Sequence, residues 1–304
     1  MYDLIIAGGG PGGIAAGVYS ARKKMKTLLI TDSFGGQSFV SADIQNWIGT
    51  KSVSGFEFAQ MMEGHLRAQE DIEIIDDDRI SLVEKKGDNF VITTNKGNKL
   101  ETKTFLVTTG SKRKKLNIPG EKEFDGRGVA YCATCDAPIF KNKVVAVVGG
   151  GNAGLEAVID LLPYASKIYL MEYGDALKGD LLTQGKIKSN PKVEILLHAK
   201  TTKISGDNMV TGLEYEDLKE KVTKKLELGG VFVEIGSIPN TDFLNGLVEL
   251  NKFGEIIVDH KTQRSSLTGI WAAGDATDVL YKQNNISAGD AVKAVLNIHD
   301  YLNK

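Results

Sequence analysis

The only two cysteines of the chain, Cys132 and Cys135, lie three positions apart and are followed directly by Asp136. In a Cys-X-X-Cys pair the two sulfurs can meet in a redox-active disulfide, and a turn leading into a helix can lower the pKa of one thiol. Asp136 is placed to give a proton to the dithiol or to accept one from it. The spacing therefore predicts a redox-active disulfide with Asp136 as its acid and base.

A zinc site and a pair of thiols without function are the alternatives for these cysteines. A structural zinc site takes four ligands, and the chain has no second cysteine pair. Its four histidines lie far from the cysteines in the sequence: His65, His198, His260 and His299. We therefore expect no metal, and the redox reading is favoured over both alternatives.

A glycine pattern near the start predicts a first dinucleotide site. Gly8, Gly10 and Gly13 form G-x-G-x-x-G between an apolar strand and a helical stretch, with Pro11 and Gly12 completing the loop. The first glycine makes a tight turn, the second lets a pyrophosphate approach, and the third allows close packing of helix and strand. The helix N-terminus then faces the phosphates. The next strand ends at Asp32, where an acid can bind the ribose hydroxyls.

A second copy of the pattern, Gly149, Gly151 and Gly154, again lies between a strand and a helix that Asn152 opens. Its second strand ends at Glu172. A purely structural glycine turn is the alternative, but two complete fingerprints imply two dinucleotides, and FAD with NAD(P)H is the common pairing.

The residues that follow the second fingerprint predict a preference for NADH. A 2′-phosphate needs an arginine or lysine near the end of the second strand. Residues 171–175 contain no arginine, and Lys178 is the nearest base. Glu172 would accept hydrogen bonds from two free ribose hydroxyls and repel a phosphate. We therefore expect NADH to be preferred over NADPH.

Two similar modules set the predicted fold. Residues 2–32 and 143–172 each form a βαβ unit, and each is followed by short strand-like runs. Helices are expected at residues 56–69 and 287–301. The fold class is α/β: two doubly wound, Rossmann-like, three-layer dinucleotide-binding domains, the second inserted in the first. Residues 1–114 and 242–304 form the FAD-binding domain, and residues 115–241 form the NAD-binding domain that carries the Cys-X-X-Cys. The two crossings between them permit a hinge.

Composition excludes several other classes of protein. The chain has 304 residues and a net charge of −2, which gives no electrostatic basis for binding nucleic acid or an anionic membrane. The basic run Lys112–Lys115 is expected to be a solvated loop, with a guide surface for an acidic partner as the alternative. No signal peptide or long apolar run is present. Because there are only two cysteines, we expect a cytoplasmic protein.

An ordered series of motifs resembles the low-molecular-weight thioredoxin reductase family. The resemblance is closest to the NADH-using C-terminal flavoprotein portion of the alkyl hydroperoxide reductase reductant subunit. The motifs cover essentially the whole chain: residues 8–16, 33–37, 44–49, 108–110, 118–121, 132–136, 149–157, 230–241, 269–275 and 281–283.

The resemblance implies a role for each matching residue. Cys135 would exchange electrons with the flavin, Cys132 would attack the disulfide of a partner, and Asp136 would be the acid and base. Ile235 and Gly236 would contact NADH. The resemblance also implies a homodimer, a large rotation between the domains, and a thioredoxin- or glutaredoxin-like partner. The FAD would be lined by Gly36, Gln37, Asn46, Gly110, Asp275, Gln283 and Ala288.

Three departures qualify the resemblance. Residues 171–173 replace the His-Arg-Arg of NADPH-using thioredoxin reductases, whereas Ala133 and Thr134 are the thioredoxin-reductase form of the Cys-X-X-Cys. Ala137 stands where the family usually has glycine. We also expect the extra N-terminal dithiol domain of the full reductant protein to be absent, so that electrons pass to a separate protein.

The leading functional prediction is a flavin-dependent disulfide reductase that uses NADH. The alternatives are an NADH oxidase, in which the cysteines are incidental, and an NADH-dependent reductant component of a peroxide-detoxifying system. A redox-sensing FAD/NAD-binding module is a non-enzymatic alternative. A ferredoxin- or flavodoxin-reductase relative shares the fold but lacks the cysteines.

Overall fold

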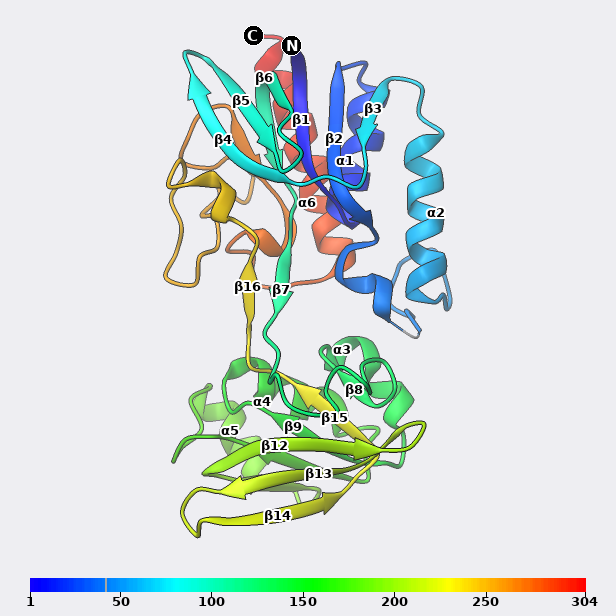
Figure 1. Cartoon of the computed structure of the whole chain (residues 1–304), viewed down its shortest axis with the longest axis vertical. Helices are drawn as coiled ribbons and strands as arrows, with labels where there is room; N and C mark the ends of the chain where they lie inside the picture. Colours follow the sequence, from blue (N-terminus) through cyan, green and yellow to red (C-terminus); the bar gives the residue numbers. More distant parts are fainter. Residues whose placement is uncertain (42) are drawn as a thin grey trace. The chain divides into compact units, whose positions relative to one another are not determined.

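The computed structural model describes residues 1–41 and 43–304, and the chain divides into two compact units. Unit 1 comprises Met1–Ser41, Asn46–Lys112 and Ile238–Lys304, and unit 2 is built mainly from Arg113–Ser237. The main part of unit 2 is thus an insertion within the sequence of unit 1, entered and left through two chain connections (Figure 1), and the short segment 43–45 also groups with unit 2.

Unit 1 is organised by a seven-stranded sheet in which β1 pairs in parallel with β2 and β6. β3 and β17 extend the parallel part, whereas β5 and β4 pair antiparallel. The strands are β1 (Tyr2–Gly9), β2 (Thr27–Phe34), β3 (Ile72–Ile75), β4 (Ile80–Lys86), β5 (Asn89–Thr94), β6 (Lys99–Val107) and β17 (Ile270–Ala272). The helices are α1 (Pro11–Arg22), α2 (Gly55–Arg67) and α6 (Asn284–Leu302).

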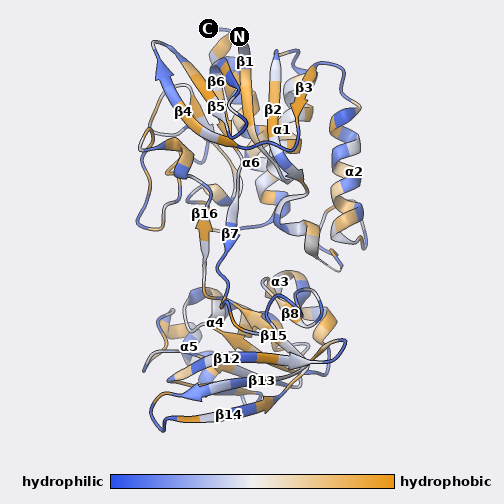
Figure 2. Ribbon diagram, in the orientation of Figure 1, coloured by the Kyte–Doolittle hydropathy of each residue, from blue (hydrophilic) through white to orange (hydrophobic). Residues whose placement is uncertain are grey.

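The core of unit 1 lies on both faces of this sheet because the central strands are apolar on both sides. Ile5 of β1 and Ile30 of β2 pack in one cluster with Phe90 of β5. Leu29 of β2 points to the other face, where its Cδ1 lies against Gly17 of α1. α1 and α6 lie side by side (Figure 1), and β1 and β2 each contain a continuous hydrophobic stretch (Figure 2).

Unit 2 has three layers around a five-stranded parallel sheet of order β11-β10-β9-β15-β8. Alternate residues of β9 separate its two cores: Val145 and Val147 pack with the helices, whereas Ala146 and Val148 pack against the antiparallel sheet β12-β13-β14. The strands are β8 (Val129–Ala130), β9 (Val144–Val148), β10 (Lys167–Met171), β11 (Val193–Leu196), β12 (Ala199–Gly206), β13 (Val210–Asp217), β14 (Val222–Glu227) and β15 (Gly230–Val233). The helices are α3 (Ala133–Asp136), α4 (Asn152–Leu161) and α5 (Leu181–Lys188).

The two connections pair with each other as the short strands β7 (Ser111–Arg113) and β16 (Ser237–Pro239). This finding corrects the expectation of a solvated loop at Lys112–Lys115: Lys112, Lys114 and Lys115 are exposed, but Arg113 lies in a strand and is partly buried. The expected helix at residues 287–301 begins earlier, at Asn284, and the one at 56–69 ends at Arg67.

Candidate functional site

Cys132 and Cys135 form a disulfide whose Cα atoms are 5.3 Å apart. Cys132 follows β8 in an extended conformation, and α3 begins at the next residue. Ala133, between the cysteines, is buried in the helix-side core of unit 2, while both cysteines remain partly exposed. Thr134 donates a hydrogen bond of 2.6 Å from Oγ1 to Oδ2 of Asp160 on α4. The core and α4 thus fix the disulfide turn.

Asp136 ends α3 and is partly buried. Burial raises the pKa of its carboxyl to about 6, and the positive charge of Arg113 opposes this rise. An acid with such a pKa can hold and release a proton near neutral pH, as general acid–base chemistry requires. The environment of Asp136 therefore suits the predicted acid–base role, which stays a prediction.

Glu234 is a second buried acid near the disulfide, and the sequence analysis did not single it out. It follows β15 and is 8% exposed. Burial raises the pKa of its carboxyl to about 7, although Arg113 and the backbone N–H of Ala133 act in the opposite direction. An acid directly after the apolar run of residues 230–233 was the available signal.

Asp136 should make the stability of the oxidised protein pH-dependent. Because its pKa is raised in the folded state, the stability it contributes is present below pH 4 and is lost as the pH rises through about 6. We expect the free energy of unfolding of Asp136→Asn, relative to that of the natural chain, to rise by about 1–2 kcal/mol as the pH goes from 4 to 7. Urea unfolding across this range measures the difference. Asp207→Asn, in an exposed turn, is the control, and an equal gain in both variants contradicts the prediction.

The first glycine loop of unit 1 suits a bound diphosphate. Helix α1 follows Gly10 without a side-chain cap, whereas α2 and α5 are capped by Ser54 and Asp180. Uncapped N–H groups at a helix start are available to phosphate oxygens. A Cβ built at Gly10 would find only the Cα of Gly36, at 3.8 Å, so the loop surface is open at this point.

The other residues predicted to line FAD come together in pairs within unit 1. Gln37 Nε2 lies 3.3 Å from Oδ2 of Asp275, and Asn46 Nδ2 lies 3.2 Å from Oε1 of Gln283. Gln283 directly precedes α6, and Ala288 lies in the early part of that helix. Gly110 adopts a positive φ of 62°. Segments more than 230 residues apart in the chain therefore meet beside the loop.

Asp32 has a partner that the sequence did not indicate. It lies in β2, and its Oδ2 accepts a hydrogen bond of 2.6 Å from Nε of Arg79 and pairs with the same guanidinium through Nη2. Both side chains are exposed to solvent, so the pair is open to a ligand. Asp32 as a ribose ligand stays a prediction, and a nucleotide would share the carboxylate with Arg79.

The second glycine loop is held by the acid at the end of β10. Glu172 is 7% exposed and accepts 2.8 Å hydrogen bonds from the backbone N–H groups of Gly150 and Gly174. Lys178 Nζ lies 3.7 Å from its Oε1. Glu172, which is predicted to bind the ribose, therefore also holds the conformation of the loop.

The remaining residues predicted for the nicotinamide nucleotide surround the same loop. Asn152 opens α4 and accepts a 2.8 Å hydrogen bond from the N–H of Asp180. Gly149 lies so close to the backbone of Glu234 that a Cβ would collide with that carbonyl, and Ile235 is the next residue along. Gly236 accepts a hydrogen bond from Lys114 N. Their roles in binding stay predictions.

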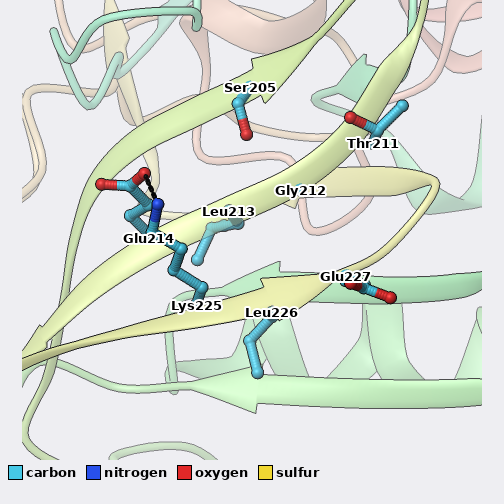
Figure 3. A pocket seen from close by; sticks show the side chains of 8 residues that line it. All are labelled: Ser205, Thr211, Gly212, Leu213, Glu214, Lys225, Leu226 and Glu227. Carbon is cyan, nitrogen blue, oxygen red and sulfur yellow. Dashed lines mark ion pairs between the residues drawn. The ribbon is translucent and has the colours of Figure 1, made fainter.

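A shallow pocket on unit 2 lies apart from all of these residues. It is lined by strands β12, β13 and β14, and two of its three charged residues, Glu214 and Lys225, pair with each other at 2.9 Å (Figure 3). Because it includes no predicted site residue, we assign no role to it. Among residues 1–41 and 43–304, no group of His, Cys, Asp or Glu side chains could hold a metal ion, and no helix could span a membrane.

Comparison with known proteins assigns the chain to a family. The sequence pattern of the pyridine nucleotide-disulphide oxidoreductases matches residues 2–293. The chain belongs to this family. The predicted family, α/β fold class and enzyme class are thereby confirmed, and the family implies a flavin and a nicotinamide nucleotide.

Relatives by sequence support the predicted resemblance to the alkyl hydroperoxide reductase protein. The alkyl hydroperoxide reductase F subunit of Staphylococcus aureus is 42% identical over 301 residues, which are 99% of this chain and 59% of that protein. NADH dehydrogenase of Bacillus subtilis is also 42% identical, over 58% of its length. The chain thus spans less than two thirds of these relatives.

Solved structures of the family match the whole fold. Thioredoxin reductase from Streptococcus pyogenes is 32% identical with a TM-score of 0.93, covering 100% of this chain and 98% of that one. Thioredoxin reductase from Giardia duodenalis is 29% identical with the same TM-score, covering 100% and 99% of the two chains.

Proposed function

We propose that the protein passes electrons from NADH through FAD to the Cys132–Cys135 disulfide and from there to a small dithiol protein. The observation that carries this proposal is the disulfide itself, formed between partly exposed cysteines and followed by a partly buried acid, Asp136. The family membership supports the same route. Thioredoxin- or glutaredoxin-like proteins are the proposed acceptors, and the likeness to the alkyl hydroperoxide reductase protein of S. aureus adds a peroxide-reducing system as the alternative.

We assign the two nucleotides to the two units. Unit 1 would hold FAD at the loop of Gly8, Gly10 and Gly13, with the pairs Gln37–Asp275 and Asn46–Gln283 beside it. Unit 2 would hold NADH at the loop that contains Gly151. FAD bound in this way supplies the chemistry that converts a two-electron hydride donor into a thiol reductant.

The cysteines and Asp136 would then carry the chemistry of the protein chain itself. Two electrons delivered to the disulfide break the S–S bond, and two protons complete the dithiol. We propose Cys135 as the sulfur that receives the electrons and Cys132 as the thiolate that attacks the disulfide of the partner. Asp136 would hold and return the proton, which its raised pKa allows near neutral pH.

Preference for NADH is proposed from the charge at the second loop. The buried Glu172 carboxylate would repel a 2′-phosphate, and Lys178, although 3.7 Å from it, is largely exposed. The name of the B. subtilis relative, NADH dehydrogenase, indicates the same preference for that protein. We expect kcat/KM for NADH to exceed that for NADPH by about tenfold or more, which corresponds to about 1.4 kcal/mol. Glu172→Gln should narrow this ratio.

An anaerobic titration of the purified protein with NADH or NADPH, followed by flavin absorbance, tests the proposal. About two equivalents of NADH should be consumed, one for the flavin and one for the disulfide. A comparable response to NADPH contradicts the proposed preference. Failure of both nucleotides to reduce the flavin contradicts the proposed route of electrons. The homodimer and the cytoplasmic location stay predictions.

A further inference from the structure

A buried carboxylate, Glu121, holds the residue that precedes the first cysteine. Glu121 is 3% exposed, and the hydroxyl of Tyr131 donates a 3.1 Å hydrogen bond to its Oε1. Tyr131 is partly buried and joins β8 to Cys132. A hydrogen bond to a carboxylate is stronger than one between neutral groups. The side chain of Tyr131 therefore fixes the point at which the chain enters the disulfide turn.

The carboxylate of Glu121 is itself fixed by the backbone. The N–H of Leu116 donates to Oε1 at 2.8 Å, and the N–H of Asn117 donates to Oε2 at 2.6 Å. Two backbone donors and one hydroxyl thus bind a single buried carboxylate. Because a buried polar group is costly to leave without a partner, these bonds keep Glu121 in one position.

The aromatic ring of Tyr131 has a contact of its own. Nζ of Lys115 lies 3.7 Å from the centre of the ring and 2.9 Å from Oδ2 of Asp125. A cation over the face of an aromatic ring is attracted to it. The ring is therefore held by Lys115 and the hydroxyl by Glu121, so two separate contacts fix one side chain.

The disulfide turn is thereby held on both sides. Tyr131 holds it before Cys132, and the bond from Thr134 to Asp160 holds it between the cysteines. A dithiol closes to a disulfide only when its two sulfurs meet. A turn that is already ordered in this arrangement loses less conformational entropy when the bond forms.

We propose that Tyr131 is a positioning residue of the disulfide centre: held by Glu121, it favours the Cys132–Cys135 disulfide over the dithiol. This inference rests on the proposed disulfide chemistry and adds a residue to it. Without the Tyr131 hydrogen bond, the reduced turn gains more freedom than the oxidised turn, which the S–S bond still closes. A more stable disulfide makes its dithiol a stronger reductant, so the contact drives electrons toward the partner protein.

Equilibration of the holoenzyme with dithiothreitol tests this inference. The protein is held under nitrogen in mixtures of reduced and oxidised dithiothreitol, and its free thiols are trapped with N-ethylmaleimide and counted by mass. In this exchange the Cys132–Cys135 bond breaks, and dithiothreitol supplies two electrons and two protons as it closes to its cyclic disulfide. We expect Tyr131→Phe to shift the equilibrium constant toward the protein dithiol about threefold or more.

Two further variants separate this contact from a general effect on folding. Tyr164→Phe is the matched control, because it removes a hydroxyl from another partly buried tyrosine of unit 2 and should leave the constant unchanged. Glu121→Gln leaves one acceptor oxygen for three donors and should shift the constant in the same direction as Tyr131→Phe. The double variant should shift it by less than the two single shifts combined, because both changes break the same bond.

An unchanged constant in Tyr131→Phe overturns the proposal, even where urea unfolding shows a loss of stability. A purely structural role would destabilise the oxidised and reduced forms equally and leave their ratio alone. An equal shift in Tyr164→Phe, or fully independent shifts from Tyr131 and Glu121, also overturns it. If Tyr131→Phe does not fold, Glu121→Gln gives the same test through the same constant.

The equilibrium with dithiothreitol needs no nicotinamide nucleotide and no acceptor protein. The expected shift in a protein that NADH does not reduce would contradict the proposed function alone. Normal NADH-dependent disulfide reduction with an unshifted constant would contradict the role of Tyr131 alone.

Discussion

Cys135→Ser is expected to lower NADH-dependent disulfide reduction about a thousandfold or more, while NADH still reduces the bound flavin. Serine keeps the size of the side chain but cannot form the S–S bond to Cys132, so electrons have no route to the acceptor. Losses of this order are typical when a residue that forms a covalent intermediate is removed. Reduction of a small aromatic disulfide, followed by absorbance, measures the rate.

Cys132→Ser is expected to cause the same loss, which separates the reductase from an oxidase. In an NADH oxidase the cysteines are incidental, and oxygen consumption would account for all turnover in both variants and in the natural chain. Retention of the full disulfide-reducing rate in either variant would overturn the proposed function. The titration should also change, because each variant accepts one equivalent of NADH instead of two.

Gly154→Ala is expected to destabilise the protein by about 1–3 kcal/mol, the usual cost of forcing atoms into a well-packed site. A Cβ at this position would collide with the carbonyl oxygen of Gly149 and approach its carbon at 2.9 Å. Both atoms belong to the backbone of the loop and cannot move aside cheaply. Unfolding in urea, compared with the natural chain at the same pH, measures the loss.

Gly151→Ala is the matched control for this prediction. A Cβ there would meet nothing within 4 Å, so the stability of the nucleotide-free protein should stay within about 0.5 kcal/mol. If a pyrophosphate approaches this surface as proposed, the same variant should weaken NADH binding. Equal destabilisation by both variants would contradict the packing argument, and unchanged NADH affinity in Gly151→Ala would contradict the proposed site.

The glycine fingerprints and the Cys-X-X-Cys could be predicted because their chemistry is local. Each fingerprint joins a strand, a turn and a helix within about 30 residues, and the structure has β1–α1–β2 and β9–α4–β10 at these places. The two cysteines need only three residues to meet. Periodicity and turn residues are sufficient evidence for such features.

The partners of the buried and paired acids could not be predicted because they come from distant segments. Asp32 pairs with Arg79, 47 residues away, and Glu234 lies near Arg113 of another strand. The carboxylate oxygens of Glu172 accept hydrogen bonds from backbone N–H groups, which every residue but proline carries. No pattern of side chains therefore marks these contacts in the sequence.

The first and last residues of the strands were also harder to predict from the sequence than the presence of the strands. Within residues 98–110 a single strand forms, β6 (Lys99–Val107), which pairs with β5 over its first part and with β1 and β17 further along. Residues 254–259, which include the apolar Ile256, Ile257 and Val258, make only isolated bridges. Tertiary neighbours decide where such runs pair.

In each unit, a backbone hydrogen bond joins the two chain segments that lead to the other unit. In unit 1 the N–H of Asn240 donates to the carbonyl of Gly110 at 3.0 Å, and in unit 2 the N–H of Lys114 donates to Gly236 at 2.9 Å. An insert whose first and last residues are neighbours can be removed or exchanged without stretching its host. A chain in which Lys112 is joined to Ile238 through a short turn should therefore still fold unit 1.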